Sequence, residues 1–229
     1  MFLEVTGQSF GVVAGALGNH DADRLSIVSF VVRHGGRFLH HNFVVALLND
    51  LFGIQSRGGC SCAGPYGHRL LGIDLEQSME FEREITRGCE GIKPGWVRVN
   101  FNYFISEQVR DFILAAVHFV ADEGWRFLPY YGFDPTTALW RHRRPLAEPP
   151  LSLGDIDYRV GIMEYRHRPR LHSDDDLAGY LDEARQLVAE MDDANLPEPI
   201  VLPLVTEDFE HLRWFPLPDE LRNASEMHR

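Results

Sequence analysis

Residues 57–68 gather side chains that can do chemistry into one short, glycine-rich segment. Their sequence is RGGCSCAGPYGH, which contains two thiols, a guanidinium, an imidazole and four glycines. Such glycine density indicates a backbone with positive φ angles, or one that closely approaches a bound group. A thiol near Arg57 and His68 can have a lowered pKa and act as a nucleophilic thiolate. The segment is therefore a candidate reactive loop.

Other interpretations of these cysteines stay open at this point. The thiols can simply pack, or they can bind zinc or take part in redox chemistry. A zinc site would combine Cys60, Cys62, His68 and Cys89, but this C-x-C-x5-H-x20-C spacing is unusual for zinc. We therefore expect no metal.

The segments around the loop predict an α+β fold in which helices cover a small antiparallel sheet. Alternating apolar and β-branched residues predict strands over 24–33 and 96–103. Apolar residues at helical spacing predict a helix over 40–52 that ends at Gly53, and a second one from its cap Ser106 to Gly124. The charge-alternating stretch 74–86 predicts an exposed helix.

The C-terminal half has a different amino-acid composition. Residues 127–172 are rich in proline and aromatic pairs, which indicates an irregular connection with one strand over 158–166. The basic run 141–144 is interpreted as solvated surface. Ser173 and Asp176 form a capping-box pattern before a long helix over about 174–192, and the tail after Asn195 is expected along the surface.

Three parts of the chain together resemble a known family. Arg57, Gly59 and Cys62 form an R-x-G-x-x-C arrangement that is similar to the loop of class V aminotransferases of the cysteine desulfurase and selenocysteine lyase branch. The stretch WVRVNFNY at 96–103, with the helix after it, resembles the closing pattern of that family. The strand and helix from Arg24 onward resemble the beginning of its small domain, so the resemblance covers about residues 24–125.

The resemblance implies a domain organisation. Residues 24–126 would be the small C-terminal domain of a fold-type I enzyme that uses pyridoxal phosphate. Residues 1–23 would be the remnant of an interdomain connection. Residues 127–229 would be an irregular and helical extension.

The resemblance also implies roles for individual residues. Arg98 would hold the carboxylate of an amino-acid substrate, because a guanidinium grips both oxygens in a fixed fork, and Arg57 would support it. Cys62 would accept sulfur from the substrate and become a persulfide, with Cys60 and His68 as auxiliary residues. Cys60 stands where desulfurases usually carry a histidine, so a class V relative that is not a desulfurase stays an alternative.

The cofactor is the missing part of this pattern. Pyridoxal phosphate enzymes bind the cofactor through a Schiff-base lysine in a large domain, and Lys93, the only lysine, matches no part of that motif. We expect no cofactor bound to this chain alone, an inactive isolated chain, a missing large domain as partner and a homo-oligomer. The alternative from another class is a non-catalytic interaction module with exposed apolar surface.

The amino-acid composition narrows the possible functions and the cellular location. Acidic residues outnumber Lys and Arg by 34 to 22, so the formal charge of −12 disfavours nucleic-acid binding. Three cysteines are too few for a disulfide framework and fit a reducing compartment, which makes the cytoplasm the expected location. The glycine-interrupted N-terminus is a poor signal peptide, and no apolar run is long enough to span a membrane.

Overall fold

The computed structural model describes residues 2–6, 9–11, 26–59, 67–68, 71–144, 153–159, 161–165, 173–191, 196–198 and 206–220. The strands are β1 (Phe2–Thr6), β2 (Ser9–Gly11), β3 (Ile27–His34), β4 (Arg37–Phe38), β5 (Arg57–Gly59), β6 (Trp96–Asn100), β7 (Tyr131–Asp134), β8 (Leu139–His142), β9 (Ile156–Asp157) and β10 (Glu164–Tyr165). The helices are α1 (His41–Phe52), α3 (Leu75–Thr86), α4 (Glu107–Glu123), α5 (Leu177–Glu190) and α6 (Glu207–Leu212).

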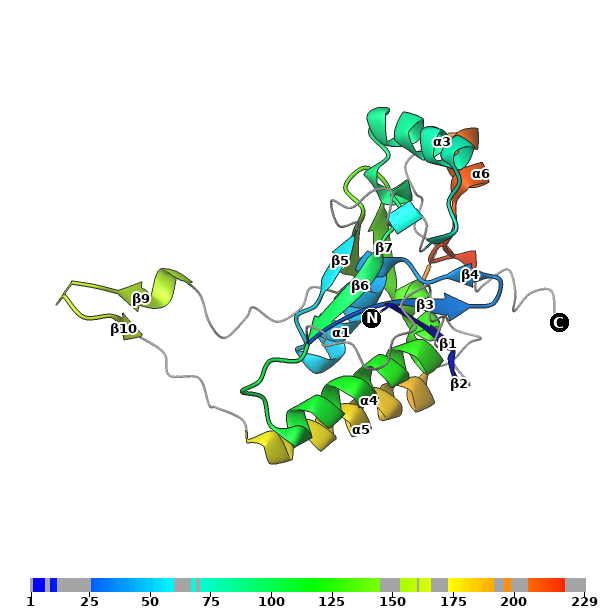
Figure 1. The fold of residues 1–229 in the computed structure, drawn as a ribbon. Helices are drawn as coiled ribbons and strands as arrows, with labels where there is room; N and C mark the ends of the chain where they lie inside the picture. The colour runs from blue at the N-terminus through cyan, green and yellow to red at the C-terminus, as the bar shows by residue number, and fades with distance from the viewer. Residues whose placement is uncertain are drawn as a thin grey trace, which may run out of the picture.

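A six-stranded sheet forms the centre of the α+β fold (Figure 1), which confirms the predicted class. The strand order is β2-β1-β3-β6-β5, and β4 pairs with the end of β3. We expected an antiparallel sheet, and this expectation is wrong for one strand pair, because β1 runs parallel to β3. The chain turns back from β1 into β2 at the sheet edge, and β3 lies on the other side of β1. Residues 2–6 and 9–11, expected as an interdomain connection, therefore extend the sheet.

One face of the sheet carries the core. Phe30 and Val32 of β3 and Val97 and Val99 of β6 alternate with outward residues and are almost fully buried against α1 and α4. Leu47 of α1 is also fully buried. Each such side chain contributes roughly 1.5–3 kcal/mol through the hydrophobic effect, so this layer holds the sheet and the helices together.

The helix boundaries follow local sequence signals. Gly53 ends α1 in the left-handed conformation, with φ 64° and its N–H on the Asn49 carbonyl, as predicted. The Ser106 hydroxyl accepts from the Val109 N–H at 3.1 Å and caps α4. Ser173 and Asp176 form the predicted capping box, which opens a 3₁₀ turn that leads into α5.

Three local predictions differ from the structure. The strand predicted over 96–103 ends at Asn100, where a turn begins. Gly124 caps α4 as predicted, but in the right-handed conformation, so that a 3₁₀ helix begins there. A Cβ on Gly124 would lie 3.2 Å from the Leu47 side chain on α1. Of the strand predicted over 158–166, only Glu164–Tyr165 is a strand, β10, and it pairs antiparallel with β9, which ends just before the predicted range.

The C-terminal half completes the core. Aromatic residues after position 126 belong to the same buried cluster as the sheet: Phe127, Tyr131, Phe133, Trp140, Phe209 and Phe215. Figure 1 shows α5 beside α4 and α6 beside α3. The expectation that the tail after Asn195 lies along the surface is therefore wrong for α6, where Phe209 is fully buried.

A buried carboxylate ties α6 to α3. Glu84 is 1% exposed, accepts from the Thr206 hydroxyl at 2.7 Å, and pairs with Arg87 at 2.5 Å. Arg87 also pairs with Asp208 of α6 at 2.7 Å. No helix in the described part of the chain has the length and apolar character needed to cross a bilayer.

Candidate functional site

Arg57 and Arg98, expected as substrate-binding residues, lie opposite each other on neighbouring strands. β5 pairs antiparallel with β6 in a register that sets Arg57 against Arg98. Opposite residues in such a pair point to the same face, with Cβ atoms about 5 Å apart. We call these two residues the arginine pair. They are distant in the sequence, and the sheet brings them together.

The arginine pair lies on the face of the sheet away from the core. Val97 and Val99 flank Arg98 in β6 and are buried in the core, so Arg98 points to the other side. Arg98 is partly exposed and Arg57 is exposed. Ser29 of β3 is the register partner on the other flank of Arg98.

The arginine pair has unbalanced charge. In the part of the chain that the structure describes, neither guanidinium has a hydrogen-bond or ion-pair partner. Like charges directly opposite each other destabilise a strand pair. An anion between them would remove this repulsion, and guanidinium groups bind carboxylates through two parallel N–H···O bonds. The arrangement is therefore suited to bind an anionic group.

The reactive loop begins and ends beside Trp96. Cys60 and Cys62 lie outside the described residues, but Gly59 and Gly67 on either side of them are described. Gly59 is the register partner of Trp96, and a Cβ on Gly67 would come within 3.1 Å of the Trp96 ring. Trp96 lies two residues before Arg98, on the same face of β6. Both ends of the loop are therefore anchored near the arginine pair.

His68 lies in a neighbouring hollow. It lines a pocket of about 290 Å³ between α3 and the start of β6, together with Lys93 and Trp96. The described lining of this pocket does not include the arginine pair. Trp96 thus separates the predicted auxiliary residue His68 from the predicted substrate-binding residues.

Lys93 does not fit the role of a Schiff-base lysine. Its side chain is 48% exposed in the turn before β6, and its ammonium lies 3.7 Å from the Glu90 carboxylate. A lysine that forms an imine with a cofactor needs an enclosed site that favours its neutral form. In the structure Lys93 therefore lacks the enclosed surroundings of such a lysine.

A buried histidine that the sequence analysis did not single out packs against the glycines of this region. His41 is 5% exposed, and burial lowers its pKa to about 3. A Cβ on Gly95 would lie 2.8 Å from Cε1 of His41, and one on Gly58 would lie 3.2 Å from Cδ2. Only glycine permits this close approach. In the sequence, the adjacent His40 and His41 at the start of an apolar helix are the one feature that could have drawn attention to this site. The sequence does not show that Gly58 and Gly95 pack against His41.

Cys89 differs from the cysteines of the loop. Burial and the negative charge of Glu84 raise the pKa of the Cys89 thiol. Among the described residues, no group of three or more His, Cys, Asp or Glu side chains is arranged to hold a metal ion. The proposed zinc ligands at positions 60 and 62 lie outside this part of the chain.

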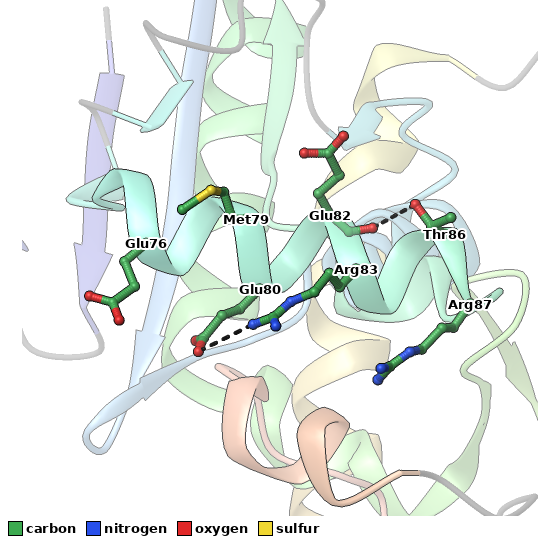
Figure 2. Close-up of a pocket in the computed structure, with 7 residues that line it drawn as sticks. All are labelled: Glu76, Met79, Glu80, Glu82, Arg83, Thr86 and Arg87. Carbon is green, nitrogen blue, oxygen red and sulfur yellow. Dashed lines mark hydrogen bonds and ion pairs between the residues drawn. The ribbon is translucent and has the colours of Figure 1, made fainter.

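The exposed face of α3 carries a shallow hollow of about 690 Å³ (Figure 2). Arg83 pairs with Glu80 at 3.7 Å, and the Thr86 hydroxyl donates to the backbone carbonyl of Glu82. Arg87 at the end of the helix is engaged with α6. This hollow is the solvated helix face that the charge pattern predicted.

No family model matches the chain, and no curated protein or solved structure is significantly similar to it. The resemblance to class V aminotransferases therefore depends on the residues quoted from the sequence.

Proposed function

We propose that this chain is the C-terminal portion of a pyridoxal phosphate enzyme of the class V aminotransferase type, and that the arginine pair binds the substrate carboxylate. The observation that carries the proposal is the register of β5 and β6, which sets side by side two guanidiniums that have no partner among the described residues. Repulsion between them makes an anionic ligand favourable at this position.

In this proposal Cys62 accepts sulfur from the substrate, as in the cysteine desulfurase and selenocysteine lyase branch. The anchoring of Gly59 and Gly67 at Trp96 supports a reactive loop close to the bound carboxylate. Cys60 and His68 act as auxiliary residues. A class V relative that acts on another amino acid would keep the arginine pair without needing Cys62.

The Schiff-base lysine of this enzyme belongs to a large domain outside this chain, because Lys93 is half-exposed and paired with Glu90. The chain alone is therefore inactive. Together with that domain it forms an active, cytoplasmic homo-oligomer. A borohydride-reducible adduct of pyridoxal phosphate on Lys93 would contradict this part of the proposal.

Arg98→Gln is expected to weaken binding of an amino-acid carboxylate to the chain at least tenfold. The amide keeps much of the side-chain length but loses the charge and the double hydrogen bond. Arg98→Lys should retain part of the affinity, since the ammonium keeps the charge without the planar fork. The measurement is an NMR titration with L-alanine that follows the backbone amides of β3 and β6.

Arg110→Gln serves as the matched control for this titration. Arg110 is an exposed arginine of α4 that pairs with Asp111 at 2.8 Å, so its loss should leave the affinity unchanged. Equal affinity in the wild type and in Arg98→Gln would exclude the arginine pair as the carboxylate site.

Cys62 is expected to react with iodoacetamide at pH 7 much faster than Cys89. The raised pKa of Cys89 keeps its thiol protonated at this pH, whereas a nucleophile near two guanidiniums has more thiolate. Peptide mapping by mass spectrometry after short exposures measures both rates. Equal, slow labelling of the two cysteines would instead indicate that Cys62 only packs.

A further inference from the structure

A second groove lies between α1 and β8. It has a volume of about 720 Å³, and its lining combines α1 with residues 55–56, 139–142 and 144. Val45, Ala46 and Leu139 provide an apolar wall, whereas Arg141 and Arg144 provide guanidiniums at exposed positions. The groove is therefore built for a ligand that has both an apolar and a charged part.

The positive charge of this groove is not fully neutralised by the protein. Apart from the arginine pair, many arginines of the described chain form ion pairs with carboxylates, such as Arg37–Glu220, Arg87–Asp208, Arg159–Asp157, Arg185–Asp182 and Arg213–Glu210. Within the described residues, Arg141 and Arg144 have no acidic partner. In a chain of net charge −12, two unpaired guanidiniums on one groove are not explained by general surface charge.

The carboxylate of Asp50 in the lining offsets only one of the two guanidinium charges and forms no ion pair with either arginine. The carboxylate of Asp50 accepts from the Tyr131 hydroxyl at 2.8 Å and from the Asn49 amide at 3.0 Å. Its oxygens are therefore occupied by neutral donors, and no ion pair joins it to either arginine.

Two polar groups of the lining residues also lack partners. Ser56 Oγ and Trp140 Nε1 are buried, and neither has a hydrogen-bond partner among the described residues. Trp140 is only 5% exposed. Buried donors are normally satisfied, and an exception calls for an explanation such as a ligand. The Trp140 ring itself packs in the core against Phe43 and Phe133, so its unpaired N–H is a reporter beside the groove and not a contact for the ligand.

We propose that this groove binds a small organic phosphate monoester. Arg141 and Arg144 would hold the phosphate dianion. Its two negative charges match the two guanidinium groups, and its oxygens can accept paired N–H hydrogen bonds from both. The organic part would lie along the apolar wall formed by Val45, Ala46 and Leu139. The site is distinct from the arginine pair, which lies on the outer face of the sheet.

Phenyl phosphate is the probe for this site, followed through the indole N–H resonance of Trp140, which a Trp140→Phe variant identifies. We expect a saturable shift in 150 mM NaCl, and at least fivefold tighter binding than for inorganic phosphate because of the apolar wall. The double variant Arg141→Gln with Arg144→Gln should bind at least tenfold more weakly. Arg185→Gln, an exposed and ion-paired arginine on α5, is the control that should bind normally.

The same titration separates this proposal from the carboxylate site. Arg98→Gln should leave the phenyl phosphate affinity unchanged, whatever it does to L-alanine binding. If Arg98→Gln abolishes the shift and the double variant does not, the ligand binds the sheet face and the groove proposal fails. Equal binding of inorganic and phenyl phosphate would also overturn it, because the groove would then hold only an inorganic ion.

Discussion

Gly95→Ala is expected to lower the free energy of unfolding by about 3 kcal/mol, in the upper part of the range for overpacking. A Cβ on Gly95 would lie 2.7 Å from the carbonyl carbon of Gly59 and 2.8 Å from Cε1 of His41. The nearest atoms belong to backbone and to a buried ring, so neither can move aside without displacing β5. Urea denaturation followed by circular dichroism measures the change.

Gly179→Ala is the matched control, since a Cβ there meets nothing within 4 Å on the exposed side of α5. Alanine is the better helix former, so this substitution should stabilise the protein by up to about 1 kcal/mol. If Gly95→Ala were as harmless as Gly179→Ala, the close packing of His41 between β5 and β6 would be refuted. Gly95→Ala should also weaken L-alanine binding, because β5 carries one member of the arginine pair.

The free energy of unfolding is expected to fall as the pH is lowered from 7 to 5. Burial holds the pKa of His41 at about 3, and burial and the neighbouring His41 hold the pKa of His40 well below its usual value. Below about pH 6.5 the unfolded chain binds protons that the folded protein excludes, so stability decreases. His41 alone accounts for about 2 kcal/mol between pH 7 and pH 5.

Urea denaturation at constant ionic strength across this range checks the expectation. Asp and Glu side chains remain largely ionised above pH 5, since their usual pKa values are about 4, so the change is due mainly to histidines. Half-buried His34, whose pKa burial also lowers, adds a contribution of the same sign. The ¹³Cε1 resonance of His41 should stay at its neutral position down to pH 5. A flat stability profile, or protonation of His41 near pH 6.5, would contradict the buried neutral ring.

Several features of the fold could be predicted from the sequence because they depend on neighbouring residues. Gly53 ends α1 through its own left-handed backbone, and Ser106 starts α4 through a bond to Val109 three residues on. The apolar spacing of α5 likewise indicated that Ala184 and Val188 face the core. These signals lie within one or two helical turns.

The candidate site was only partly predictable. The sequence indicated Arg57 and Arg98 as functional residues, but their register is a property of strand pairing between distant segments. The groove beside α1 was not predicted, because the basic run 141–144 resembled ordinary solvated surface. That Arg141 and Arg144 have no acidic partner among the described residues, whereas Arg143 between them pairs with Asp219, is visible only in three dimensions.

The sequence by itself determined the α+β class, the helix ends and the identity of the chemically capable side chains, because periodicity and capping act over a few residues. Only the tertiary structure decided that β1 joins the sheet in parallel, that α6 inserts Phe209 into the core, and that two arginines face each other with no counter-charge in the described part of the chain. These outcomes depend on long-range packing and on the balance of buried surface and charge across the whole fold, which no local pattern records.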